Sequence, residues 1–158
     1  MIPSWLAIGI VTLAVPITLN RFISDRDFRW FRRLRRPDWL TFEGAIPLIW
    51  TVIFIFGAWS AYSVWSANPG TISTWLLMSF YLLVETAISL YTLVMCKTRS
   101  LKVGTFIGGT GFFLGVILAV IVLPRSNTAF WLLVPYLLWS PIGTFVTWQM
   151  MQLNPGDI

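Results

Sequence analysis

Five long apolar stretches occupy most of the chain, and this pattern limits the possible folds more than any other feature of the sequence. They cover residues 3–20, 44–65, 74–96, 103–123 and 128–152. An α-helix rises about 1.5 Å per residue, so about 20 residues cross the hydrocarbon core of a bilayer. Each stretch reaches that length or falls just short of it. The pattern predicts an all-α fold, an integral membrane bundle of five transmembrane helices that forms one domain over residues 1–158.

The composition argues against several kinds of chemistry. The chain is 57% hydrophobic and only 11% charged, and it has no histidine and a single cysteine, Cys96. Histidine is the usual general base at neutral pH and the commonest metal ligand. A single cysteine leaves no intrachain disulfide. We therefore expect no metal site, no resident cofactor and no nucleophile–base pair, which disfavours a conventional enzyme.

The distribution of basic residues predicts the topology. Of the 11 Lys and Arg residues, seven lie in the loop 21–43, three lie between residues 97 and 102, and one is Arg125. The positive-inside rule places the first and third loops and the C-terminus in the cytoplasm, and the N-terminus outside. Because the basic loop adjoins helix ends, we expect anionic lipid headgroups rather than nucleic acid as its neighbours.

The basic loop also carries apolar side chains in a helical pattern. Phe28, Phe31 and Leu34 recur at spacings of three, so they would share one face of a helix. Such a segment is either a juxtamembrane anchor in the membrane interface or a lid folded over the mouth of the bundle.

Glycines recur along the fourth apolar stretch. Gly104, Gly108, Gly111 and Gly115 include two pairs spaced four residues apart. Small residues at that spacing let helix backbones approach closely in membranes. We interpret them as packing positions rather than ligand contacts.

Glu85 lies near the centre of the third stretch without an intramembrane Lys or Arg to pair with. A carboxylate in that position is costly, so we expect it to face the bundle interior. Tyr81, Thr86 and Ser89 lie nearby as possible hydrogen-bond partners. Glu85 then has either a functional role, as a polar contact to a ligand or a proton-linked switch, or a structural one, as a neutral acid hydrogen-bonded between helices.

Tryptophan is unusually abundant, with 10 residues. Those near the ends of the apolar stretches fit the aromatic belt at headgroup depth. Four tryptophans fit it less well, because each lies one or more turns inside its stretch: Trp50, Trp59, Trp139 and Trp148. Of these, Trp50 and Trp139 are the candidates for a pocket. Aromatic rings that face a bundle interior form a stacking surface for a flat apolar ligand.

Three segments, in order along the chain, resemble motifs of the translocator protein family, also called tryptophan-rich sensory proteins or TspO/MBR. Residues 30–39, W-F-R-R-L-R-R-P-D-W, resemble a first-loop signature that reads roughly W-Y-x-x-L-x-K-P-x-W-x-P-P. Trp50-Thr51 with Tyr62 and Trp65 is similar to the family's W-T-x-L-Y…Y-x-V-W. Residues 134–139, V-P-Y-L-L-W, are similar to its P-Y-x-x-W.

The sequence also departs from the family pattern. Phe31 replaces the tyrosine of the first-loop signature, and Thr41 and Phe42 replace its two final prolines. In the third stretch, Val84 and Ile88 replace two Gln or Asn residues of the family pattern. Glu85 is new. Residues 145–153 lack the tyrosine followed by Lys or Arg of proposed sterol motifs, so the sequence does not support sterol binding.

The resemblance implies a pocket beneath the first loop, often in a homodimer, with porphyrins as ligands. The implied binding residues are Trp50 and Trp139 at the pocket, Phe31 and Trp39 in the lid, Glu85 as a polar contact, and Phe54, Pro135 and Tyr136. Our first hypothesis is a membrane protein that binds a tetrapyrrole for transport, sensing or stress signalling. The alternatives are a light-dependent porphyrin-degrading enzyme, and a structural or partner-binding bundle without a small ligand.

Overall fold

The computed structural model describes residues 2–157 of the chain, and this part is helical with no strand. Its helices are α1 (Ser4–Asn20), α2 (Asp25–Arg33), α3 (Ile46–Ala67), α4 (Ile72–Thr98), α5 (Leu101–Val122) and α6 (Asn127–Leu153), with short 3-10 turns η1 (Glu43–Ala45) and η2 (Pro155–Asp157). The predicted stretches match α1 and α3 to α6 to within two residues at each end. The all-α membrane bundle is thus confirmed.

Four helices, α3 to α6, are each long and apolar enough to cross a membrane. Helix α1 has 17 residues, which corresponds to a length of about 25 Å, slightly less than a hydrocarbon core of about 30 Å. The chain bends by 84° between α1 and α2, so the charged α2 leaves the direction of the spanning helices. The protein is a multi-pass membrane protein with four to five spans.

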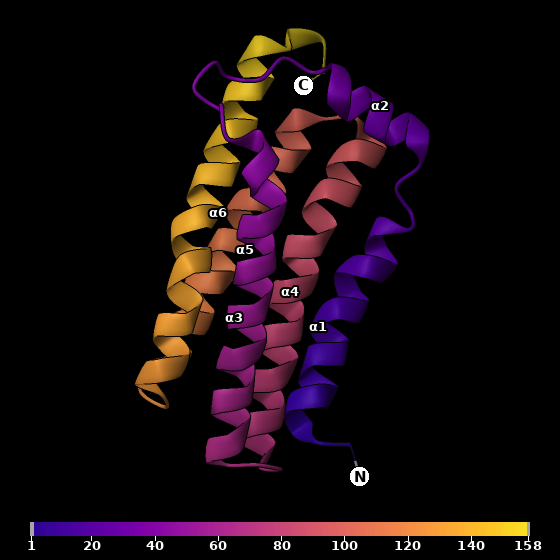
Figure 1. Cartoon of the computed structure of the whole chain (residues 1–158). Coiled ribbons are helices and arrows are strands. Elements are labelled where there is room, and N and C mark those ends of the chain that lie inside the picture. Colours follow the sequence, from indigo (N-terminus) through magenta and orange to yellow (C-terminus); the bar gives the residue numbers. More distant parts are fainter. Residues whose placement is uncertain (1, 158) are drawn as a thin grey trace.

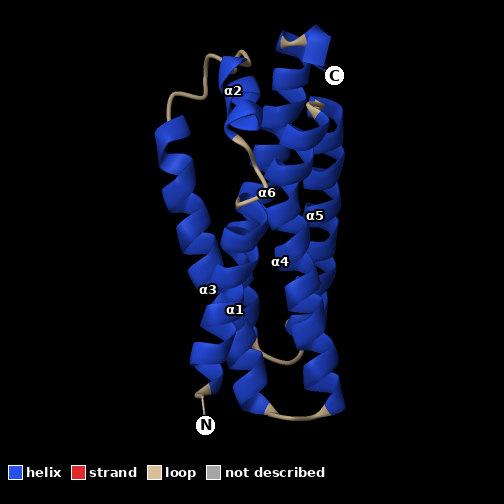
Figure 2. Cartoon of the chain, turned by 90° about the vertical axis from the view of Figure 1, so that its right-hand side faces the viewer, coloured by secondary structure: helices blue, strands red, loops and turns tan. Residues whose placement is uncertain are grey.

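The five long helices form a closed ring. Helix α1 packs against α3 and α4, α5 packs against α4 and α6, and α3 packs against α6. The order around the bundle is therefore α1, α3, α6, α5, α4, and each helix presents one face to a shared interior (Figures 1 and 2).

Both strongly basic connections lie at the same end of this bundle. Helix α2, the α4–α5 connection and the C-terminal turn η2 lie at one end, while the N-terminus and the α3–α4 turn lie at the other (Figures 1 and 2). The ion pair between Lys97 and Asp27, at 2.8 Å, joins the two basic connections directly.

Helix α2 forms where its sequence supplies both end signals. Ser24 and Asp27 make a capping box, in which the Ser24 hydroxyl accepts from the Asp27 backbone N–H and the Asp27 carboxylate accepts from the Ser24 N–H. Arg32 and Arg33 lie in the last turn, where positive charge is favourable to the helix dipole. The 3.6-residue period then decides which side chains face the bundle.

The face that α2 buries matches the predicted one only in part. Trp30 and Leu34 are each 4% exposed and pack with Met95 and Met150 of the bundle, whereas Phe28 is 40% exposed. Of the predicted face Phe28–Phe31–Leu34, Phe31 and Leu34 do pack on the bundle, but Trp30 takes the inward position expected of Phe28, where its indole donates to Asp157. The packing of Trp30 and Leu34 on the end of the bundle is the arrangement that the lid alternative expects.

The glycines of α5 are confirmed as packing positions. A Cβ on Gly104 would lie 2.5 Å from the Met95 sulfur of α4. A Cβ on Gly108 would lie 2.7 Å from the Thr144 hydroxyl oxygen of α6. Without side chains at these positions, α5 approaches both neighbouring helices closely.

Candidate functional site

Two cavities lie one above the other inside the ring of helices. The upper chamber, with a volume of about 450 Å³, lies beneath the loop 34–45, and the lower chamber, of about 520 Å³, extends toward the N-terminal end of the bundle. They share the walls formed by Phe54, Ile88 and Tyr136. Both volumes fall within the range of about 300–1,000 Å³ typical of small-molecule pockets.

The upper chamber brings together most of the aromatic residues that the sequence suggested. Trp50 of α3 and Trp139 of α6 both line it, as do Phe31 of α2, Phe54 and Tyr136. By contrast, Trp59 and Trp148 are 55% and 41% exposed on the outside of the bundle. Depth within a helix was therefore a weaker guide to the pocket than the face on which a tryptophan lies.

Trp39 contributes to the lid from outside the chamber. Its indole Nε1 donates to the Gln149 side-chain oxygen at 2.6 Å, and its ring stacks on Phe145 with centroids 6.2 Å apart. Phe42 joins this cluster and meets Trp139 edge-on at 6.4 Å. The loop is thus connected by aromatic contacts to one wall of the upper chamber.

The structure separates Glu85 from the two tryptophans. Glu85 lines the lower chamber, whereas Trp50 and Trp139 line only the upper one. Pro135 lines neither chamber and lies within α6, half-buried.

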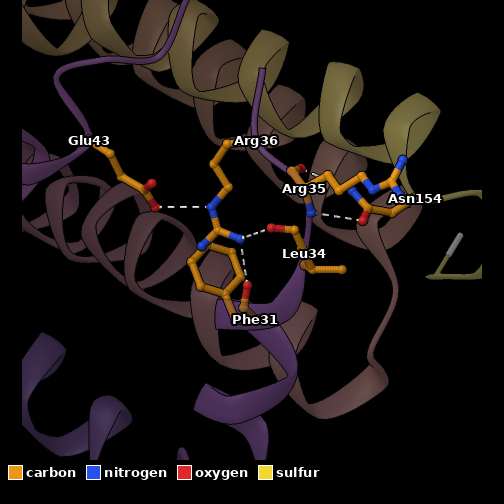
Figure 3. A network of polar contacts seen from close by, with 6 residues as sticks. All are labelled: Phe31, Leu34, Arg35, Arg36, Glu43 and Asn154. Carbon is orange, nitrogen blue, oxygen red and sulfur yellow. Dashed lines mark hydrogen bonds and ion pairs between the residues drawn. The ribbon is translucent and has the colours of Figure 1, made fainter. Parts of the chain in front are cut away.

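Arg36 holds the lid in shape (Figure 3). Its guanidinium donates to the carbonyl oxygens of Phe31 at 2.7 Å and Leu34 at 2.6 Å, and its Nε donates to Glu43 at 3.1 Å. The same guanidinium lies 4.6 Å from the centroid of the Phe31 ring, a cation–π contact. One side chain therefore joins the end of α2 to the start of η1 across the intervening loop.

The C-terminal residues fix the lid from the other side. The Arg35 backbone N–H donates to the Asn154 side-chain oxygen at 2.9 Å, and the Asn154 amide donates back to the Arg35 carbonyl at 3.1 Å (Figure 3). Asp157 accepts from Trp30 Nε1 at 2.7 Å and from Arg33 at 2.8 Å. The hydrogen bond from Trp30, followed by that from Arg33, holds the pKa of Asp157 below its usual range.

The ion pair of α2 with α4 has a similar electrostatic effect. The hydrogen bond from the Lys97 ammonium, assisted by the N–H and hydroxyl of Ser24, holds the pKa of Asp27 well below its usual range. Asp27 of α2 and Asp157 of η2 are thus both stabilised in their ionised forms.

Four buried polar atoms of the described chain have no hydrogen-bond partner, and all belong to residues that line the chambers. They are Glu85 Oε1 in the lower chamber, Ser89 Oγ and Trp139 Nε1 in the upper chamber, and the Tyr136 hydroxyl at their shared wall. A buried polar group without a partner costs about 1–3 kcal/mol. Their concentration at cavity walls indicates groups available to the polar atoms of a ligand.

The expected partners of Glu85 are engaged elsewhere or remain unpaired. The Tyr81 hydroxyl pairs with Ser60 of α3 at 2.6 Å, and the Thr86 hydroxyl donates to the Leu82 carbonyl at 2.7 Å. Ser89 faces the upper chamber instead. The expectation that these hydroxyls bind Glu85 was wrong, because each has a nearer acceptor or a different orientation.

Residues 2–157 contain no cluster of three or more His, Cys, Asp or Glu side chains that could hold a metal ion. The lower chamber and the role of Ser89 were not predicted from sequence, because neither lies on a recognisable motif.

Fold and site together define a helical membrane protein with two ligand-sized cavities, the upper of which lies beneath an aromatic lid. Residues 7–153 match the model of the TspO/MBR family, and the chain belongs to that family. It is similar to the uncharacterized membrane protein YtaB of Bacillus subtilis (strain 168), with 25% identity over 151 residues that cover 94% of this chain and 95% of the relative. It is also similar to the tryptophan-rich protein TspO of Bacillus cereus, with 26% identity over 131 residues that cover 81% and 82% of the two chains.

Proposed function

We propose that this protein binds a tetrapyrrole of the porphyrin type in the upper chamber, in a transport, sensing or stress-signalling role. The observation that carries the proposal is the position of Trp50 and Trp139 on α3 and α6, where both line one cavity of about 450 Å³. Indole faces stack on flat conjugated rings, and burial of such a ring supplies the main part of the binding energy.

The polar groups of the chamber suit the periphery of such a ligand. Ser89 Oγ and Trp139 Nε1 lack protein partners and can bond to ligand nitrogen or carboxylate atoms. Porphyrin propionates are anionic, and the side chains of Arg32 on α2 and Arg35 in the loop 34–45 are exposed. Their positive charge steers an anionic ligand toward the chamber, while Arg33 and Arg36 are occupied by Asp157 and Glu43.

A fluorescence titration tests the proposal. Protoporphyrin IX is added to the purified protein and to Trp50→Phe and Trp139→Phe, and quenching of tryptophan emission is followed. We expect saturable quenching in the wild type and weaker affinity in both variants, because each loses indole surface. Linear quenching that is the same in all three proteins would mean that porphyrin only partitions into the detergent micelle.

We further propose that the end of the bundle that carries α2 and the C-terminus faces the cytoplasm. Ten of the 11 basic residues lie there, seven in loop 21–43 and three in 97–102, and the positive-inside rule applies to such short connections. The test uses single-cysteine proteins in a Cys96→Ser background, with Arg32→Cys or Ser66→Cys. A membrane-impermeant maleimide added to intact cells should label Ser66→Cys only, and labelling of Arg32→Cys instead would reverse the orientation.

A further inference from the structure

The lower chamber is a second cavity large enough for a small molecule, and the proposed function does not use it. Residues of α1, α3, α4, α5 and α6 line it, and most of them are apolar, as are Val11, Ile53, Leu118 and Leu133. Its wall excludes both Trp50 and Trp139. The chamber therefore offers a different surface from that of the upper one.

Its distinguishing feature is one carboxyl group. Glu85 Oε1 is buried at this wall without a hydrogen-bond partner, and the hydroxyls of Tyr81 and Thr86 are bonded to other atoms. Among the described residues, no Lys or Arg lines the chamber. Lys97, on the same helix, lies at the far end of α4 and pairs with Asp27. Among residues 2–157, no Lys or Arg side chain at this wall complements the acid.

We propose that the lower chamber is a second ligand site, which takes a lipophilic amine. The ammonium group pairs with Glu85, and the apolar body fills the space between the aliphatic walls. An ion pair that is also hydrogen-bonded is strong in surroundings of low dielectric constant. The same carboxylate repels anions, so the two chambers select ligands of opposite charge.

Access to this site is independent of the lid. At the end of the bundle away from α2, the wall includes Ile2 and Trp75, which are 69% and 58% exposed. The lid segment 34–45 contributes no residue to this chamber. A ligand can therefore reach Glu85 without displacement of Arg36 or its partners.

Two probes with the same ring system test the charge requirement. 1-Pyrenemethylamine and its neutral counterpart 1-pyrenemethanol are titrated into the purified full chain, with energy transfer from tryptophan to pyrene as the readout. We expect the amine to bind saturably. The alcohol forms no ion pair with Glu85, so we expect its affinity to be lower by about tenfold or more. In Glu85→Gln the amine should lose its advantage, while the alcohol should be unaffected. Equal affinities of the two probes for the wild type would overturn the proposal.

Two glycines allow the chambers to be filled separately. A Cβ on Gly57 or on Gly143 meets no atom within 4 Å, and Gly57 lines only the lower chamber whereas Gly143 lines only the upper one. We expect Gly57→Leu to abolish binding of the amine and Gly143→Leu to preserve it. Loss of amine binding only in Gly143→Leu would place the probe in the upper chamber and refute the second site.

Protoporphyrin binding to the same proteins separates this inference from the proposed function. If the amine binds as expected but no variant affects porphyrin, the proposed function fails and the second site stands. If porphyrin binds the upper chamber but the amine only partitions into the detergent micelle, to the same extent in the wild type, Glu85→Gln and Gly57→Leu, the second site is refuted and the proposed function stands. Far-UV circular dichroism establishes that each variant retains its helical content.

Discussion

The ring of Tyr136 on α6 occupies the space in which Gly115 of α5 would carry a side chain. A Cβ at Gly115 would overlap the ring, with Cδ1 only 3.0 Å away, and a Cβ at Gly111 would lie 3.3 Å from the hydroxyl oxygen. Because Tyr136 also forms part of the wall shared by the two chambers, the close packing of α5 on α6 sets the shape of both cavities.

Substitution Gly115→Ala should therefore destabilise the protein. The added methyl group forces Tyr136 out of its position, and overpacking of this kind typically costs about 1–3 kcal/mol. The midpoint of thermal unfolding in detergent measures the effect. Gly109→Ala on the same helix is the matched control, because its Cβ meets no atom within 4 Å. Equal midpoints for the two variants would show that Tyr136 is not held by this contact.

Arg36→Lys should loosen the lid. Lysine presents a single ammonium group and cannot donate simultaneously to Phe31, Leu34 and Glu43 as the guanidinium does. Each hydrogen bond to a charged group contributes about 1.5–3 kcal/mol, so loss of even one should speed amide exchange in residues 34–45 by about tenfold or more.

Hydrogen exchange followed by mass spectrometry measures this change. Arg32→Lys provides the comparison, since the Arg32 side chain is exposed and makes no hydrogen bond or ion pair within the described chain. Faster exchange in both variants, or in neither, would mean that the lid is held by other contacts.

Acid should release α2 from the bundle. Asp27 has a lowered pKa in the docked lid, because it accepts from Lys97 and Ser24, while an undocked aspartate titrates near the ordinary value of about 3.9. The contribution of Asp27 to docking is therefore complete above the ordinary value and is lost as the pH falls toward the lowered pKa. Asp157 acts in the same direction.

Hydrogen exchange of the α2 amides, measured as a function of pH and corrected for the intrinsic effect of pH on the exchange rate, reports this release. In Asp27→Asn we expect weaker protection at neutral pH and a smaller loss on acidification. Asp25→Asn alters an exposed acid in the first turn of the same helix and should behave as the wild type. An unchanged pH profile in Asp27→Asn would disprove the role of the pair with Lys97.

Hydropathy was sufficient to predict the long helices, because a segment in lipid must satisfy its backbone groups internally and has few alternatives to a helix. The packing role of Gly104 and Gly108 was also predictable, since the spacing itself creates a smooth helix face. These features depend on residues close together in the sequence.

The burial of Trp30 on α2 and the surroundings of Glu85 depend on distant residues and could not be predicted from local sequence. Trp30 turns inward because Asp157 accepts its indole N–H from the other end of the chain. Tyr81 is unavailable to Glu85 because Ser60 of α3 binds it. The lower chamber was not predicted, because a cavity depends on how the side chains of five helices pack together and has no local sequence motif.

The most direct test of the central claim is a protoporphyrin IX titration of the wild type, Gly143→Leu and Gly57→Leu under identical conditions. A leucine at position 143 adds bulk to the wall of the upper chamber, which Trp139 also lines, whereas a leucine at position 57 adds bulk only to the lower one. The account predicts that Gly143→Leu loses saturable quenching and that Gly57→Leu binds porphyrin like the wild type. Identical curves for all three proteins, or loss in Gly57→Leu alone, would contradict it.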